Sequence, residues 1–169
     1  MENISLIKPV RDGVIEYALD LGCGRGVDSD YLKSLGYKVI SVDKEHYYKD
    51  VILANLNDYP IEQGRYSLII CNNVLPFIEN KREVEKILFG IITGLKKDGA
   101  TFITFYGHNS GFIGKEGMSF FTFEEILKLI DGLPVNIMDK TTTEGYSKNG
   151  RGETIYQHSH RFILKKRSI

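Results

Sequence analysis

The stretch Asp20-Leu21-Gly22-Cys23-Gly24-Arg25-Gly26 joins two segments with different hydrophobic periodicity. Residues 15–21, which end at the glycines, predict a strand, and residues 27–35 place apolar side chains on one helical face before Gly36 stops the helix. Glycines between a strand and a helix allow a tight turn, let a ligand approach the backbone, and leave helix N–H groups free. The stretch therefore predicts a strand–loop–helix unit with a ligand site at its loop.

The rest of the chain alternates between strand and helix patterns. A long helix from Val84 is predicted to close at Lys96-Lys97-Asp98-Gly99, Thr122 and Glu125 predict a capping box that starts a shorter helix, and residues 44–50 leave room for two helical turns at most. Further strands are predicted at residues 38–43, 51–56, 66–71, 100–105, 135–141 and 156–165, the last two joined by a polar loop over 142–155. This order predicts one α/β domain, residues 1–169, with a doubly wound sheet.

Composition excludes several classes of protein. The chain has 169 residues, and its 22 Lys+Arg balance its 22 Asp+Glu, so the net charge gives no electrostatic footprint for nucleic acid or a membrane surface. No apolar run approaches the ~20 residues that span a bilayer, and Met1–Ser5 lacks the pattern of a secretory signal, so we expect a cytoplasmic protein. Cys23 and Cys71 are expected to be buried free thiols, and residues 165–167 a solvated basic tail.

The spacing of the glycines argues against a dinucleotide site. A dinucleotide fingerprint that starts at Gly22 and Gly24 needs its third glycine where Val27 stands. The stretch instead resembles the first motif of the class I S-adenosylmethionine-dependent methyltransferases, an acidic residue two positions before a G-x-G-x-G run. The resemblance implies that Asp20, Gly22, Gly24 and Gly26 bind S-adenosylmethionine, and that the seven-stranded mixed sheet carries an antiparallel C-terminal strand.

The same resemblance extends over about residues 15–105. Asp43 ends its strand where the family has an acid that holds the ribose hydroxyls, although a solvated strand-end acid remains an alternative. Asn55 and Leu56 match the segment that contacts adenine, with Asp58 close by and a turn-forming Asn as the alternative. Asn72 follows the fourth strand, which passes the methyl-donating centre in that family.

Three tyrosines and three histidines remain as candidates for other roles. Tyr47 and Tyr48 could flank an adenine ring or pack against the sheet. Methyl transfer needs a general base only if the acceptor must lose a proton. Candidates for that role are Tyr106, His108 and neighbouring Asn109 after the fifth strand, and His158, ranked above His160, near the end. A packed core role for the late histidines stays open, and no third ligand is spaced to make them a metal site.

The residues after the fourth strand constrain the acceptor. Asn72-Asn73-Val74-Leu75 lacks the Pro-Pro-aromatic motif that nucleobase amino-methyltransferases carry, and Cys71 lacks the preceding proline of cytosine-C5 enzymes. With loose similarity to tellurite-resistance-type enzymes around residues 120–125, the sequence predicts methyl transfer to a small molecule. The alternatives are a binding module or partner subunit without turnover and, more weakly, a nicotinamide-dependent oxidoreductase.

Overall fold

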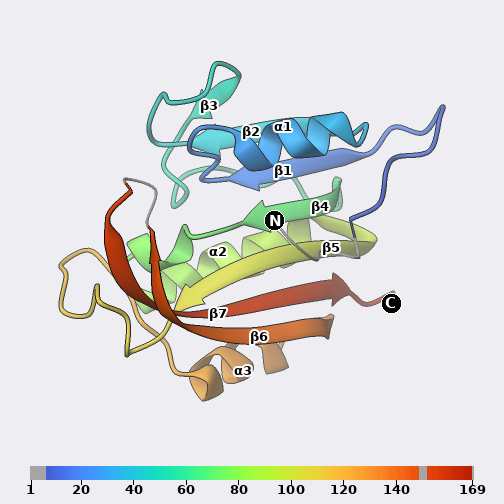
Figure 1. Ribbon diagram of the computed structural model, residues 1–169. Coiled ribbons are helices and arrows are strands. Elements are labelled where there is room, and N and C mark those ends of the chain that lie inside the picture. Colours follow the sequence, from blue (N-terminus) through green and yellow to red (C-terminus); the bar gives the residue numbers. More distant parts are fainter. Residues whose placement is uncertain (1–6, 149–151, 169) are drawn as a thin grey trace.

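The computed structural model describes residues 7–148 and 152–168, which form one seven-stranded sheet with helices on both faces (Figure 1). The segment Met1–Ser5, where a signal sequence was sought, lies outside these residues. The spatial order of the strands is β3-β2-β1-β4-β5-β7-β6. The strands are β1 (Tyr17–Leu21), β2 (Lys38–Asp43), β3 (Val51–Leu53), β4 (Tyr66–Cys71), β5 (Leu95–Tyr106), β6 (Val135–Lys148) and β7 (Thr154–Lys166).

The sheet is mixed, as predicted. Strands β1 to β5 pair in parallel, whereas β7 runs antiparallel to both β5 and β6. The chain reverses direction across the sheet at β1, which lies between β2 and β4. In open sheets of this kind, ligands bind beyond the carboxyl ends of the strands at that reversal. The topology therefore directs attention to the loop after β1.

The helices divide between the two faces of the sheet. Helix α1 (Val27–Ser34) buries Leu32 against Ala18, Leu68 and Ile70 on one face. The other face carries α2 (Lys81–Gly94), α3 (Phe123–Asp131) and the short 3₁₀ helix η1 (Leu75–Phe77). The capping box predicted for α3 is confirmed, because Thr122 accepts from the Glu125 N–H and Glu125 accepts from the Thr122 N–H.

The short helix predicted at residues 44–50 is wrong, because this segment forms bends and a turn. Tyr48, only 5% exposed, supplies the packing that a helix would give. Its hydroxyl donates to Asp30 Oδ1 at 2.6 Å and accepts from Lys33 Nζ at 2.8 Å, which ties the turn to α1. Seven residues between two parallel strands are too few for a helix to cross over and pack.

The predicted end of the long helix is also wrong. Helix α2 stops at Gly94, and Leu95 already pairs with Tyr66 of β4. The Lys96–Gly99 stretch forms a bulge in β5, with Asp98 in the left-handed region at φ 62°. A cation still serves the helix end, because Lys166 Nζ donates to the carbonyls of Leu95 (2.6 Å) and Thr93 (3.2 Å). The basic residues at 165–166 therefore belong to β7 and are no solvated tail.

Strand pairing replaces part of the loop predicted over residues 142–155. The ladder of β6 and β7 runs out to Lys148 paired with Thr154. The first and third strands, by contrast, are shorter than predicted, starting at Tyr17 and ending at Leu53. The two cysteines are buried and free, as expected. No helix among the described residues is long and apolar enough to cross a membrane.

Candidate functional site

The glycine loop, residues 20–26, has three glycines with positive φ, and each has a different surrounding. A Cβ at Gly22 would lie 2.2 Å from the Val74 side chain, and one at Gly26 would lie 2.2 Å from the Tyr48 ring. A Cβ at Gly24 would meet nothing within 4 Å. Gly22 and Gly26 are therefore required by internal packing, and Gly24 is the position where the backbone is open to a ligand.

Asp43 lies against this open backbone. Its Oδ2 accepts from the Gly24 N–H at 2.8 Å, and its Oδ1 accepts from the Glu45 N–H at 2.9 Å. The half-buried carboxylate at the end of β2 therefore holds the middle of the glycine loop. Each carboxylate oxygen has a further lone pair, so both can still accept from a vicinal diol.

Asp20 lies beneath the loop, and its side chain is shielded from solvent. The residue is 2% exposed, and its Oδ2 accepts from Ser29 Oγ at 2.6 Å, which in turn bonds Ser41 Oγ at 2.7 Å. Burial raises the pKa of Asp20 to about 6, because desolvation penalises the charged carboxylate more than the Ser29 hydrogen bond favours it. Asp20 thus joins β1, β2 and α1 and could act on a ligand through the loop above it.

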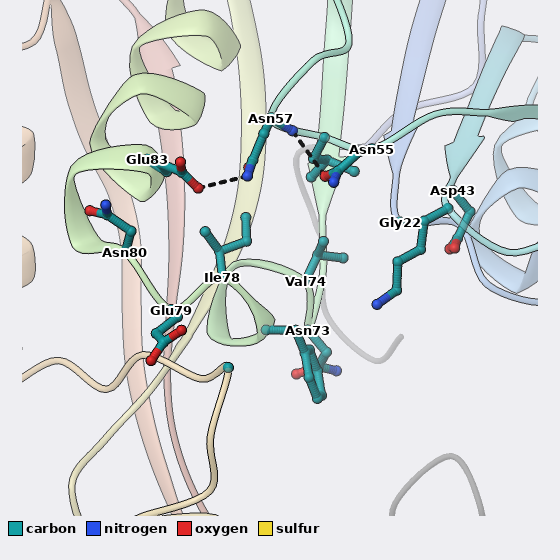
Figure 2. Close-up of a pocket in the computed structure, with 14 residues that line it drawn as sticks. Gly22, Asp43, Asn55, Asn57, Asn73, Val74, Ile78, Glu79, Asn80 and Glu83 are labelled. Carbon is teal, nitrogen blue, oxygen red and sulfur yellow. Dashed lines mark hydrogen bonds between the residues drawn. The ribbon is translucent and has the colours of Figure 1, made fainter.

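A cavity of about 640 Å³ opens beside the loop at the carboxyl ends of the parallel strands (Figure 2). Gly22 and Asp43 lie on one side of it, and Glu79, Asn80 and Glu83 lie on the other. The remaining lining residues come from η1 and from the loops that follow β2, β3, β4, η1 and β5: Lys44, Asn55, Leu56, Asn57, Asn73, Val74, Phe77, Ile78 and Gly117. Of the predicted cofactor residues, Gly22, Asp43, Asn55 and Leu56 line the cavity, whereas Asp20, Gly24, Gly26 and Asn72 do not.

The segment after β3 brings amide groups to the cavity. Asn55 Oδ1 accepts from the Asn57 N–H at 3.3 Å, which folds the backbone into a turn. The Asn57 side chain donates to Glu83 Oε2 at 2.6 Å, so the start of α2 closes this part of the wall (Figure 2). The turn-forming role and the cavity-lining position of Asn55 therefore coexist.

The end of β4 places two asparagines differently. Asn72 is half-buried, and its Oδ1 accepts from Thr104 Oγ1 at 3.0 Å. Asn73 is exposed in the cavity wall and has φ 56°, a left-handed conformation that asparagine adopts more readily than most residues. This conformation turns the chain from β4 into η1 and seats Val74 on Gly22.

One part of the cavity wall is aromatic. Phe77 of η1 lines the cavity and remains 49% exposed. Its ring packs edge-on against Tyr106 at 6.2 Å, and Tyr106 stacks on Phe112 at 5.8 Å. Gly117 reaches the same wall from the loop of residues 107–121. A half-exposed phenylalanine backed by buried rings offers an apolar surface to a ligand.

The three predicted catalytic residues do not line the cavity. Tyr106 is buried behind Phe77, and burial raises its pKa. His108 is exposed, with its Nε2 3.8 Å from Glu125 Oε2. His158 Nδ1 accepts from the Asn109 N–H at 3.1 Å, and its ring lies 4.7 Å from that of buried His160. These catalytic roles stay predictions. The described ring contacts of His158 are with Asn109 and His160, and the residue does not line the cavity where an acceptor would lie.

Sequence reasoning missed the lining residues at η1 and the start of α2. Glu83 stands three residues after the helix cap Asn80, where a capping box would turn it toward the backbone. It bonds Asn57 instead, a contact between segments that no local pattern reveals. Val74 and Phe77 belong to a stretch whose pattern gives no sign of which side chains face the cavity.

A family model described as a methyltransferase domain matches residues 19–103, from β1 to the middle of β5. The chain belongs to this methyltransferase family. The resemblance predicted from the motifs is therefore confirmed at the level of the family. No curated protein matches the sequence.

Solved methyltransferases share the fold of this methyltransferase-family chain. An S-adenosylmethionine-dependent methyltransferase from Methanosarcina mazei has 16% identity and a TM-score of 0.73, with 95% of this chain and 96% of that chain covered. TehB from Haemophilus influenzae has 20% identity and a TM-score of 0.74, with 92% and 59% covered, so this chain spans little more than half of TehB. A 1,6-didemethyltoxoflavin-N1-methyltransferase from Burkholderia thailandensis, solved with S-adenosylhomocysteine, has 17% identity, a TM-score of 0.68, and 92% and 73% covered.

Proposed function

We propose that this protein transfers the methyl group of S-adenosylmethionine to a small-molecule acceptor. The observation that carries the proposal is the open backbone at Gly24, whose N–H is held by the Asp43 carboxylate, together with the cavity of about 640 Å³ that Asp43 and Gly22 line. A nucleoside with a charged tail needs two kinds of contact. An open glycine lets the tail approach the backbone, and a carboxylate at the end of the next strand can accept from the two hydroxyls of the ribose.

The residues of the cavity fit that ligand part by part. Asp43 would accept the two ribose hydroxyls, and Asn55 with Leu56 would lie along the adenine ring. The glycine loop would hold the methionine part, with buried Asp20 favouring its ammonium group from beneath. When bound, S-adenosylmethionine would supply an electrophilic methyl group: a nucleophilic atom of the acceptor would form its bond to the methyl carbon as the methyl–sulfur bond breaks, with S-adenosylhomocysteine as the leaving group.

The acceptor would bind against the wall that Phe77 and Gly117 form. The chain's task there is to hold a nucleophilic atom in line with the methyl–sulfur bond and to keep water out, since displacement depends on position. The apolar Phe77 face suits a compact or planar acceptor. The neutral net charge of the chain favours such a molecule over a polyanion.

The first test is calorimetry with S-adenosylhomocysteine, with NAD as the control nucleotide. We expect micromolar binding of S-adenosylhomocysteine and none of NAD. Binding of NAD alone would favour the oxidoreductase alternative, and binding of neither would remove the cofactor assignment.

The second test is turnover. A panel of thiols, amines, hydroxylated and nitrogen heteroaromatics, and tellurite would be screened for release of S-adenosylhomocysteine. Release with a member of the panel would support the enzyme. The alternative of a binding module without turnover is favoured by the position of Tyr106, His108 and His158 outside the cavity wall, and silence across the panel together with tight cofactor binding would support it.

A further inference from the structure

The sheet continues past β5 as a two-stranded hairpin arm, residues 144–148 of β6 and 154–158 of β7 (Figure 1). The last pair between β5 and β7 joins Tyr106 to Ser159, so beyond that point the two strands of the arm pair only with each other. The cavity does not use the arm directly, because none of its lining residues comes from these strands. The arm therefore needs another explanation.

The turn after β5 is docked on this arm. The Gly107 N–H donates to the His158 carbonyl at 2.7 Å, and the Gly111 N–H donates to the Tyr156 carbonyl at 2.7 Å. Between them, the Asn109 N–H donates to His158 Nδ1 at 3.1 Å, and Asn109 Nδ2 donates to Glu144 Oε1 at 2.9 Å. Both strands of the arm thus contact a turn of five residues.

His158 occupies the centre of this contact. Because its Nδ1 accepts the Asn109 N–H, the tautomer that fits this contact has its proton on Nε2. The ring covers Gly107, where a Cβ would lie 2.3 Å from the imidazole. A side chain at position 107 would displace the ring, so the glycine and the histidine fit each other.

The far part of the same loop reaches the cavity. The Ser119 N–H donates to the Pro76 carbonyl of η1 at 2.9 Å, and Gly117, two residues earlier, lines the wall. Phe112, one residue beyond the docked turn, stacks on Tyr106 at 5.8 Å, and Tyr106 backs Phe77. The loop is therefore fixed to the arm at its start and to η1 near its end, with the cavity wall between these anchors.

We propose that His158 is a positioning residue, which anchors the 107–121 loop on the hairpin arm and thereby sets the shape of the cavity at its Phe77–Gly117 wall. The assignment of that wall to the acceptor rests on the proposed function; the anchoring itself does not. His158 acts through the loop and does not touch the reacting atoms.

Amide hydrogen exchange tests the anchor without any ligand. In the His158→Ala variant we expect the amides of Asn109 and Gly111 to exchange roughly three to ten times faster than in the wild type, which is the loss of about one hydrogen bond. His158→Asn places Oδ1 near the position of Nδ1 and should restore slow exchange at Asn109. His158→Gln places its acceptor near Nε2 and should not.

Gln157→Ala is the matched control. Gln157 is the neighbour of His158 on β7, its side chain points to the opposite face, and no change in exchange of the loop is expected. Equal exchange rates at Asn109 and Gly111 in the wild type and His158→Ala would overturn the proposal.

Cofactor binding and turnover separate this proposal from the proposed function. S-adenosylhomocysteine affinity of His158→Ala should stay within twofold of wild type, because neither His158 nor any other arm residue lines the cavity. With an acceptor from the panel, His158→Ala should raise its KM about fivefold with little change in kcat, and His158→Asn should rescue it. Loss of kcat in both variants, despite restored exchange in His158→Asn, would make His158 a proton acceptor and overturn the positioning role. If the wild type binds no S-adenosylhomocysteine, the proposed function fails while the exchange result still decides the anchor.

Discussion

At the Asp43 side of the cavity, the contacts come from the ends of two neighbouring parallel strands, β1 and β2, and the loop after β1. At the Phe77 side they come from η1 and from the 107–121 loop, which is itself held by the arm around residue 158. The first side is made of segments close in sequence, whose backbone conformations are fixed by glycines. The second is made of segments far apart, joined by a few hydrogen bonds.

Under the proposed function, this difference would let one fold keep its cofactor site while the acceptor site changes. The Asp43 side is inseparable from the sheet, because Gly22 and Gly26 are packed under Val74 and Tyr48. The Phe77 side consists of η1 and a loop that follow the ends of β4 and β5, and such connections can vary without disturbing the strands. Variants should therefore affect either cofactor binding or acceptor use, and seldom both.

The largest expected effect is at Gly24. Gly24→Leu places a side chain in the space left for the ligand and also strains a residue with φ 52°, so S-adenosylhomocysteine binding should fall more than about 100-fold by calorimetry. Gly64→Leu is the matched control, since Gly64 has φ 65° and equally open surroundings away from the cavity. Comparable loss of binding in the control would show that backbone strain alone causes it.

Asp43→Asn tests the ribose assignment on the same side. The amide keeps the size of the side chain but accepts with one oxygen only, and charged hydrogen bonds are worth about 1.5–3 kcal/mol. We expect S-adenosylhomocysteine affinity to fall about 10- to 100-fold, measured by calorimetry, with the acceptor KM unchanged. Unaltered affinity would show that Asp43 only holds the glycine loop, through its hydrogen bond with the Gly24 N–H, and does not bind the ribose.

Asp20 gives the Asp43 side a dependence on pH. Its pKa is raised from 3.8 to about 6 in the folded protein, so its contribution to stability is fully present below pH 3.8 and is lost as the pH rises through 6. The loss amounts to at most about 3 kcal/mol for a shift of about two units. Asp20→Asn removes this titration, and its free energy of unfolding relative to wild type should rise between pH 4 and pH 7 in urea titrations. A difference that stays constant across this range would contradict the prediction.

Phe77→Ala should have the smallest effect of these variants. Unlike Gly24→Leu and Asp43→Asn, it should weaken use of the acceptor and leave cofactor binding unchanged. Loss of the ring should raise the KM of an acceptor from the panel about threefold to tenfold, since such aromatic contacts are worth about 0.5–1.5 kcal/mol. S-adenosylhomocysteine affinity should stay within twofold. Phe89→Ala, which removes a similarly exposed ring from α2 outside the cavity, serves as control. Weaker cofactor binding in Phe77→Ala would show that the two sides are not independent.

Much of the architecture was predictable because it is local. The runs at β2 and β4 match their predicted bounds, and the capping box of α3 forms as Thr122 and Glu125 predict. The prediction of a helix at residues 44–50 was wrong, because this segment folds as a turn that packs Tyr48 on Gly26. The end of α2 was wrong because pairing of Leu95 with Tyr66 outweighed the helical pattern.

The sequence by itself determined the family, the mixed sheet, and the residues Gly22, Asp43, Asn55 and Leu56 that line the cavity. Strand ends, glycine turns and hydrophobic periodicity are properties of neighbouring residues, so they predicted the sheet and its loops. The family and the site roles of Asp43, Asn55 and Leu56 came from the resemblance of these motifs to the methyltransferases. Only the tertiary structure decided that Gly24 alone of the three loop glycines is open, that Glu83 turns to Asn57, and that His158 holds a turn of the backbone. The Asn57–Glu83 and Asn109–His158 hydrogen bonds join residues that are 26 and 49 positions apart in the sequence. A local sequence pattern does not reveal which residues so far apart will meet.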